Sequence, residues 1–170
     1  NIAKTVPILV EKEIKEKKFI STGVYILDAA LSGRLLGGGV ATNRITSFAG
    51  ESGAGKSFLC YSCAKNAQKA GYSVIYIDTE QAIDLEDLPK FGIDNSLEKF
   101  RLIRSNKVED LNITLTKLID ELKEQKLAGY ELPKLMIVLD SLGQMASNKE
   151  KEDLLSGSIK QDMTKAKALG

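Results

Sequence analysis

The sequence predicts an α/β fold in which helices flank a mostly parallel sheet. Two nearly continuous apolar runs, residues 73–78 and 135–140, are typical of strands buried on both faces of a parallel sheet. An amphipathic helix is predicted between them, over 108–127. A glycine-rich loop at 50–57 lies between a predicted strand and a predicted helix, an order in which such folds build phosphate sites.

Composition limits the class of protein. The chain has 170 residues, which suits one domain with a substantial core. Its 24 lysines and arginines nearly balance 23 aspartates and glutamates, so a nucleic-acid site would have to be a local basic patch. We find no run of apolar residues long enough to span a membrane and no secretory leader, and we therefore expect a cytosolic protein with no membrane partner.

The first segment, residues 1–18, differs from the rest in its dense mixture of charges. Opposite charges four residues apart, such as Glu11 and Lys15, favour a solvated helix. We assign residues 1–20 to an N-terminal helical arm and residues 21–170 to the core. The arm either packs on its own domain or docks on a neighbouring subunit, and its amphipathic pattern leaves both open.

The next elements lead to the glycine-rich loop. A short helix over 24–31 is expected to end at Ser32-Gly33, and Gly37-Gly38-Gly39 predicts a turn, because no helix follows it directly. Residues 44–49 contain β-branched and aromatic side chains and are predicted to form the strand that enters the loop. A helix over 58–67 is predicted to leave it.

Cys60 and Cys63 are the only cysteines, and both lie on this predicted helix. The C-x-x-C spacing occurs in redox pairs and zinc sites, but the chain has no histidine and no second cysteine pair to complete a zinc site. Both side chains fall on one helix face, so we interpret them as small apolar residues of the core.

The loop from Gly50 to Ser57 fits G-x-x-x-x-G-K-[ST], the Walker A pattern that cradles the phosphates of a nucleoside triphosphate. Its glycines let successive backbone N–H groups converge on an anion in front of a helix N-terminus. Lys56 is expected to reach the β- and γ-phosphates, and the Ser57 hydroxyl is expected to bind Mg²⁺. The predicted nucleotide-binding residues are Gly50, Glu51, Ser52, Gly53, Ala54, Gly55, Lys56, Ser57 and Phe58.

Acidic residues at two predicted strand ends complete the candidate site. Strand 135–140 ends in Asp140, as a Walker B strand does, and this carboxylate would position Mg²⁺ together with Ser57. Strand 73–78 is followed by Glu80, which either orients the water that attacks the γ-phosphate or is an ordinary solvated glutamate. The residues alone leave both readings of Glu80 open.

The remaining predicted elements are shorter. A short acidic helix is expected over 84–90 and a short strand over 100–104, before the long amphipathic helix. After Asp140, residues 147–158 are polar and charged and predict a loop, and residues 159–169 resume a helical pattern.

Taken together, these segments resemble the RecA-type recombinases, and within that family the phage strand-exchange branch. The resemblance spans about residues 19–170 and implies a RecA-like ATPase core. The stretches that carry it are residues 21–31, 50–57, 76–84, 137–141, and the segments from 140 to 153 and from 162 to 167.

The resemblance implies roles for individual residues. Glu80 would be the catalytic residue that activates water, with Lys56 beside the phosphates, and Asp84 would lie near the adenine. ATP and Mg²⁺ would be the cofactors. The loop 147–158 would be a DNA-binding loop, with lysines beyond it as further phosphate contacts. The candidate DNA contacts are Ser147, Asn148, Lys149, Lys151, Lys160, Lys165 and Lys167.

The same resemblance implies a function. The chain would be the core of a DNA-dependent ATPase that forms a helical filament on single-stranded DNA and exchanges strands with a homologous duplex. It would be phage-encoded and act in the cytoplasm of the host. The alternatives are a helicase or loader ATPase of the RecA superfamily and a nucleotide-binding scaffold with little turnover.

The sequence departs from the family's pattern in two places. Asp87 stands where the bacterial proteins have a tyrosine that stacks on adenine, which puts base stacking in question. The chain also stops at Gly170, before the second DNA-binding loop of the family. We therefore expect a core that is incomplete at its C-terminal end.

Overall fold

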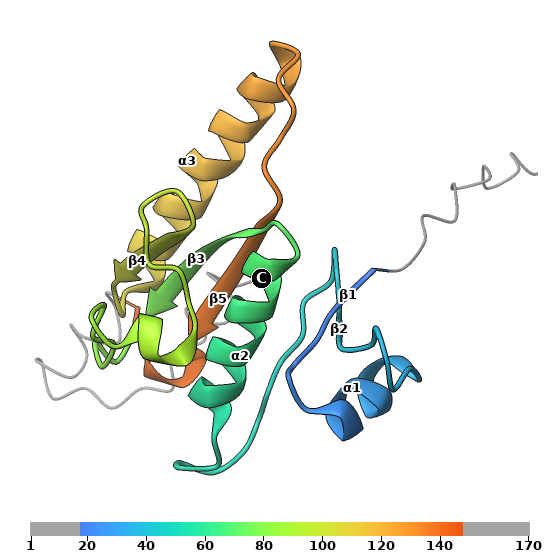
Figure 1. The fold of residues 1–170 in the computed structure, drawn as a ribbon. Coiled ribbons are helices and arrows are strands. Elements are labelled where there is room, and N and C mark those ends of the chain that lie inside the picture. The colour runs from blue at the N-terminus through green and yellow to red at the C-terminus, as the bar shows by residue number, and fades with distance from the viewer. Residues whose placement is uncertain (1–17, 148–170) are drawn as a thin grey trace, which may run out of the picture.

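The computed structural model describes residues 18–147 and confirms the α/β class (Figure 1). Three parallel strands form its main sheet in the order β4-β3-β5. They are β3 (Ser73–Asp78), β4 (Phe100–Arg104) and β5 (Leu135–Asp140), and each coincides with a predicted strand. Asp78 is in register with both Arg104 and Asp140, so the three strands end level at one edge of the sheet.

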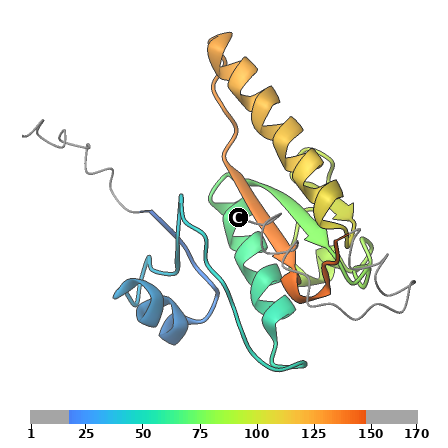
Figure 2. The same cartoon turned by 180° about the vertical axis from the view of Figure 1, so that it is seen from behind.

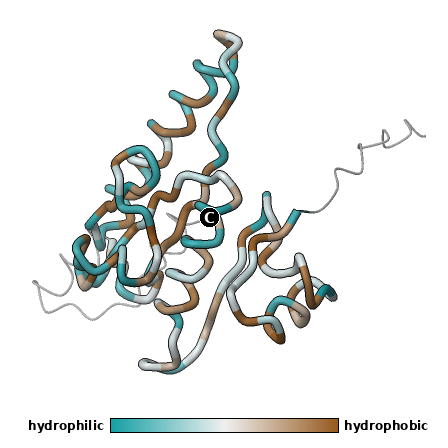
Figure 3. The backbone as a smooth tube through the Cα atoms, in the orientation of Figure 1, coloured by the Kyte–Doolittle hydropathy of each residue, from teal (hydrophilic) through white to brown (hydrophobic). Residues whose placement is uncertain are grey.

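Two helices cover opposite faces of this sheet. Side chains alternate along a strand, and on β3 Val74 and Tyr76 join the core cluster of α2 (Lys56–Lys69), while Ile77 joins that of α3 (Val108–Leu127). Figures 1 and 2 show α2 and α3 on the two sides of the sheet, and Figure 3 shows the apolar character of the strands between them. Burial on both faces explains why β3 and β5 are largely apolar.

A smaller unit precedes the glycine-rich loop and lies against α2. β1 (Phe19–Ile20) pairs antiparallel with β2 (Val40–Ala41), and α1 (Tyr25–Ser32) connects them. Gly33 ends α1 in a left-handed conformation, as predicted. The Asn66 side chain of α2 donates a hydrogen bond to the Ser21 carbonyl at 2.9 Å, which ties this unit to the main core.

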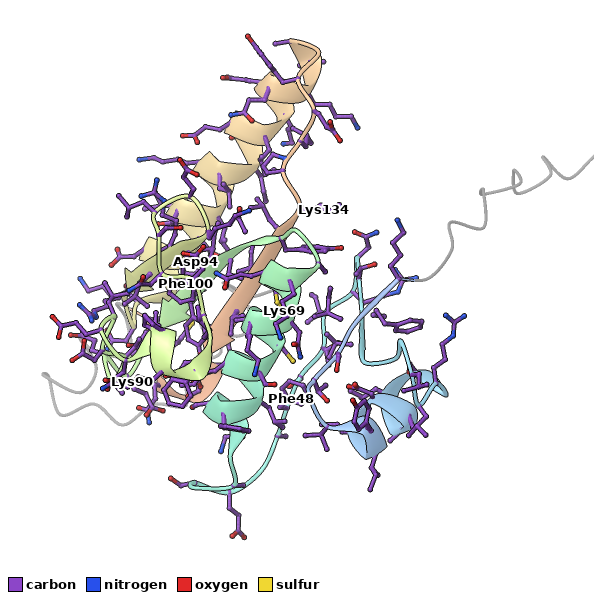
Figure 4. The ribbon with its side chains drawn as sticks, viewed as in Figure 1. Phe48, Lys69, Lys90, Asp94, Phe100 and Lys134 are labelled. Atoms are coloured by element: carbon purple, nitrogen blue, oxygen red, sulfur yellow. The ribbon has the colours of Figure 1, made fainter. Side chains whose placement is uncertain are left out.

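The strand predicted over 44–49 is wrong. This segment runs extended from β2 to α2 without joining a sheet (Figures 1 and 2). β-propensity favours an extended chain, but a strand also needs a ladder partner and apolar surface to bury. Ile45 is fully exposed, and Phe48, labelled in Figure 4 beside α2, is the residue of the segment that packs on the core.

The acidic helix predicted over 84–90 is also wrong. A turn follows Asp84 instead, and a single 3-10 turn, η2 (Leu88–Phe91), comes after it. The Asp84 carboxylate accepts a hydrogen bond from the Glu86 backbone N–H at 2.9 Å. Such local bonding by aspartate stabilises turns at the expense of helix. A second 3-10 turn, η3 (Leu142–Gln144), follows β5.

Several predictions concern other parts of the chain. Most of the N-terminal arm and the helix over 159–169 lie outside the described residues, so the division into an arm and a core stays a prediction. No helix within residues 18–147 is both long and apolar enough to cross a membrane.

Candidate nucleotide-binding site

The loop from Gly50 to Ser57 connects the extended segment to α2. Gly53 and Gly55 adopt positive φ angles of 78° and 86°, which glycine reaches without steric cost, and Gly55 is the residue from which α2 begins. The loop residues from Glu51 to Gly55 are exposed, and Ser57 and Phe58 in the first turn of α2 are exposed as well. An exposed glycine loop in front of a helix N-terminus provides backbone N–H groups and a positive dipole end for an anion.

Lys56 points back over its own loop. Its ammonium Nζ donates hydrogen bonds to the carbonyl oxygens of Gly50 at 2.9 Å and Glu51 at 2.7 Å. The cation therefore already lies across the loop that the sequence assigns to phosphate binding. An anion in the loop would offer the Lys56 ammonium an ion pair as well as hydrogen bonds, which the neutral carbonyls do not provide.

Asp140 is the last residue of β5. It lies on the face of the sheet that carries α2, because Val138, two residues earlier, belongs to the α2-side core. The Tyr76 hydroxyl donates to Asp140 Oδ2 at 2.9 Å. A carboxylate has a second oxygen, Oδ1, which can accept from a cation or from the water that surrounds it.

Cys60 indicates that the start of α2 lies close to this carboxylate. Burial raises the pKa of Cys60 to about 11, and the negative charge of Asp140 adds to the shift. Ser57 lies one helical turn before Cys60 and so shares its face of α2. The Ser57 hydroxyl and the Asp140 carboxylate are hard oxygen ligands on one side of the sheet, a donor set that fits Mg²⁺ together with phosphate oxygens.

Both cysteines pack in the core, as the sequence predicted. Cys63 is 2% exposed and lies with Ala64 and Ala67 in the α2-side cluster, against which Cys60 also packs. Burial raises the pKa of Cys63 to about 12. Thiols in such surroundings stay protonated and behave as small apolar groups.

The ends of β3 and β5 are joined by hydrogen bonds. Thr79 Oγ1 donates to the Ser141 carbonyl at 2.9 Å and accepts from the Ser141 N–H at 2.8 Å, and the Thr79 N–H donates to the Asp140 carbonyl at 2.9 Å. Glu80 follows directly and is exposed, and its Oε1 accepts a hydrogen bond of 3.3 Å from the Ser141 hydroxyl. Glu80 and Asp140 thus lie at neighbouring strand ends with Ser141 between them.

Asp78, at the end of β3, is buried and stabilises the turn that follows the strand. It is 2% exposed, and its Oδ2 accepts a hydrogen bond from the Ile83 backbone N–H at 2.9 Å. Asp84, Asp87 and Lys90 continue from there on the exposed surface, where Lys90 pairs with Asp87. Lys90 is labelled in Figure 4.

The predicted DNA contacts fall at the end of the described chain. Ser147 is 0% exposed, next to Ala146, whose backbone N–H donates to the Asn106 carbonyl at 2.8 Å. The other predicted contacts lie outside the described residues: Asn148, Lys149, Lys151, Lys160, Lys165 and Lys167.

Two residues that matter here were not found from the sequence. Asp28 is a polar residue within the apolar sequence of α1, and Tyr76 is an aromatic residue within the apolar sequence of β3. The alternation of β3 places Tyr76 on the α2 side, two residues before the strand end, and that signal was available. Asp28 needed the structure, because its partners Ser21 and Thr22 come from the preceding loop.

A parallel sheet with a Walker A loop, and with acids at the neighbouring strand ends, defines a P-loop nucleotide-binding protein. Residues 3–120 match the family described as the RecA N-terminal domain. The chain therefore belongs to the RecA-type recombinase family.

Individual relatives agree with this assignment. The chain is 33% identical over 134 residues to the DNA repair and recombination protein RadB of Thermoplasma acidophilum, covering 79% of this chain and 53% of that protein. It is 31% identical over 141 residues to Protein RecA of Mycoplasma genitalium, covering 83% and 37%. It is 27% identical over 167 residues to the recombination and repair protein of Enterobacteria phage T4, covering 97% and 40%. The chain thus spans about half of these relatives or less.

Proposed function

We propose that this chain is the nucleotide-binding core of an ATP-dependent DNA recombinase that acts as a filament on single-stranded DNA. The names of the relatives refer to recombination and repair and support a role in that process. The Walker A loop and the two acidic strand ends support ATP as the nucleotide that drives it. One observation carries the proposal: Asp140 ends β5, and Glu80 follows the end of the adjacent strand β3, where the Ser141 hydroxyl bonds it.

The loop would hold the phosphates. Its backbone N–H groups and the helix dipole of α2 favour negative charge at this point. Lys56 would leave the carbonyls of Gly50 and Glu51 and bond the β- and γ-phosphates, where its charge has a stronger partner. Phe58 and the remaining loop residues would lie beside the nucleotide, and Asp84 would lie toward the base.

Ser57 and Asp140 would hold the Mg²⁺ that accompanies ATP. When bound, the ion neutralises charge on the phosphate oxygens. Ser57 contributes a hydroxyl ligand from the first turn of α2, and Asp140 contributes a carboxylate whose position the sheet fixes. Both side chains lie on the α2 side of the sheet, so they could bind the same ion.

Glu80 would orient the attacking water. Its carboxylate is exposed, and the Ser141 hydroxyl donates to one of its oxygens, which leaves the other to accept from water. The Thr79–Ser141 bonds join the ends of β3 and β5, and Glu80 directly follows Thr79, which would keep its carboxylate near Asp140. A base held beside the metal ligand suits in-line attack on the γ-phosphate.

DNA would contact the chain beyond β5. The loop over 147–158 would approach single-stranded DNA, with the lysines at 149, 151, 160, 165 and 167 bonding phosphates, and residues 1–20 would dock on the next subunit. A homologous duplex would be the second substrate. These roles rest on the resemblance and on the positions of the residues in the sequence.

ATP turnover by the complete protein, with and without single-stranded DNA, tests the proposal. We expect DNA to stimulate turnover, and we expect Glu80→Gln to reduce it about 100-fold while ATP still binds. Glu86→Gln, an exposed neighbour on the same surface, is the matched control and should retain normal turnover. Binding without turnover in the wild type would favour a scaffold, and undiminished turnover in Glu80→Gln would refute the role of Glu80.

A further inference from the structure

The hydroxyl of Tyr76 is a buried polar group in an otherwise apolar cluster. The residue is 0% exposed, and its ring lies 5.6 Å from that of Tyr61 and 6.0 Å from that of Phe100. Burying a hydroxyl without a partner is unfavourable, and a phenylalanine would fill the same space. The hydroxyl donates to Asp140 Oδ2 at 2.9 Å, and it also interacts with the Cys60 thiol. A phenylalanine at this position would therefore lack the bond to the candidate metal ligand.

The sheet itself determines this contact. Tyr76 is in register with Val138, and Asp140 lies two residues further along β5 on the same face. Diagonal neighbours on adjacent strands are within reach when one side chain is long and aromatic. Both residues belong to regular strands, so neither end of the bond depends on a loop.

We propose that Tyr76 is a positioning residue for the metal: its hydroxyl fixes Asp140 Oδ2 and thereby directs Oδ1 toward the cation of the nucleotide site. This inference rests on the proposed function. Side chains that orient a metal ligand control metal affinity although they do not touch the metal. Tyr76 fits this description, since it is fully buried and its hydroxyl bonds one oxygen of the candidate metal ligand.

Metal binding can be measured without turnover. Mn²⁺, a paramagnetic substitute for Mg²⁺, is titrated into the complete protein with ADP present, and free Mn²⁺ is followed by electron paramagnetic resonance. We expect Tyr76→Phe to weaken Mn²⁺ binding about tenfold. Affinity for ADP in the presence of EDTA should stay within about twofold, because the phosphate loop is unaltered.

Tyr61→Phe is the matched control. It removes a hydroxyl from the same aromatic cluster, and within residues 18–147 the hydroxyl bonded to Asp140 is that of Tyr76. Its Mn²⁺ affinity should equal that of the wild type. The double variant Tyr76→Phe with Asp140→Asn should bind Mn²⁺ no more weakly than Asp140→Asn alone, since Tyr76 acts through Asp140.

The outcomes separate the inference from the function on which it rests. If the wild type binds no nucleotide, the proposed function fails. If it binds ADP and Mn²⁺ but Tyr76→Phe does so equally well, the inference alone is overturned. It is also overturned if Tyr76→Phe weakens metal-free ADP binding as much as Mn²⁺ binding, if Tyr61→Phe has the same effect, or if Tyr76→Phe does not fold.

Discussion

Asp28→Asn should destabilise the unit that packs beside α2. The carboxylate is 2% exposed and accepts three hydrogen bonds: from the Thr22 N–H at 2.7 Å and Thr22 hydroxyl at 2.6 Å to Oδ1, and from the Ser21 hydroxyl at 2.5 Å to Oδ2. Asparagine keeps an acceptor for Thr22 but removes the charge, and it replaces the acceptor for Ser21 with a donor. Bonds to charged groups contribute about 1.5–3 kcal/mol and neutral ones about 1 kcal/mol. The expected loss in unfolding free energy is therefore about 2–3 kcal/mol.

The pH dependence provides a second measurement of the same interaction. Burial alone would raise the pKa of Asp28, but the hydrogen bonds from Ser21 and Thr22 outweigh it and lower the pKa below 3.8. A lowered folded-state pKa means that the contribution is complete above the unfolded pKa and is lost as pH falls through the folded value. The stability difference between wild type and Asp28→Asn should thus shrink as the pH falls below about 4.

Urea unfolding followed by circular dichroism, from pH 7 to pH 3, measures both effects. Glu98→Gln, which alters an exposed acid elsewhere, is the control and should change stability by less than about 0.5 kcal/mol. A loss in Asp28→Asn no larger than that of the control would refute the reasoning. So would a difference between wild type and variant that stays constant down to pH 3.

Two further predictions concern the core and the turn before β2. The pKa values of Cys60 and Cys63 are raised to about 11 and about 12. Alkylation by iodoacetamide should therefore be slow at pH 7 and accelerate with rising pH. An alkylation rate at pH 7 equal to that of glutathione would contradict the burial of these thiols. Gly39→Ala should lower the unfolding free energy by about 3 kcal/mol, since a Cβ there would lie 2.0 Å from the Ile20 carbonyl oxygen. Gly37→Ala, where a Cβ meets nothing within 4 Å, should lose only about 1 kcal/mol, and equal losses in urea unfolding would refute the steric argument.

The strands and helices with long apolar patterns were predictable, because burial leaves a direct mark on the sequence. β3, β4, β5 and α3 all have the predicted bounds. A strand covered on both faces, such as β3 or β5, is apolar at nearly every position, and a helix covered on one face repeats its apolar residues every three or four. For these elements the local pattern and the tertiary surroundings agree.

The two elements that were not predicted correctly are those whose local preference competes with another interaction. Over 44–49 the residues favour an extended chain, but a strand requires a partner that the pattern cannot specify. At Asp84 the side chain bonds a nearby backbone N–H and stabilises a turn where the charge pattern suggested a helix. The hydrogen bonds of Asp28 with Ser21 and Thr22 could not be predicted for a related reason, since they depend on how the chain folds back before α1.

The candidate site combines parts that the fold positions in different ways. Asp140 is held by the sheet, since it ends β5 in register with Asp78 and Tyr76 bonds one of its carboxylate oxygens. Glu80 lies just beyond the end of β3, next to Thr79, and accepts a bond from the Ser141 hydroxyl. The phosphate loop is held by α2, and an extended segment outside any sheet leads into it. On the proposed function, Asp140 is already positioned before a nucleotide arrives, whereas Lys56 would exchange two carbonyl partners for phosphate. Binding should accordingly reorganise the loop and its lysine while Asp140 stays where the sheet holds it.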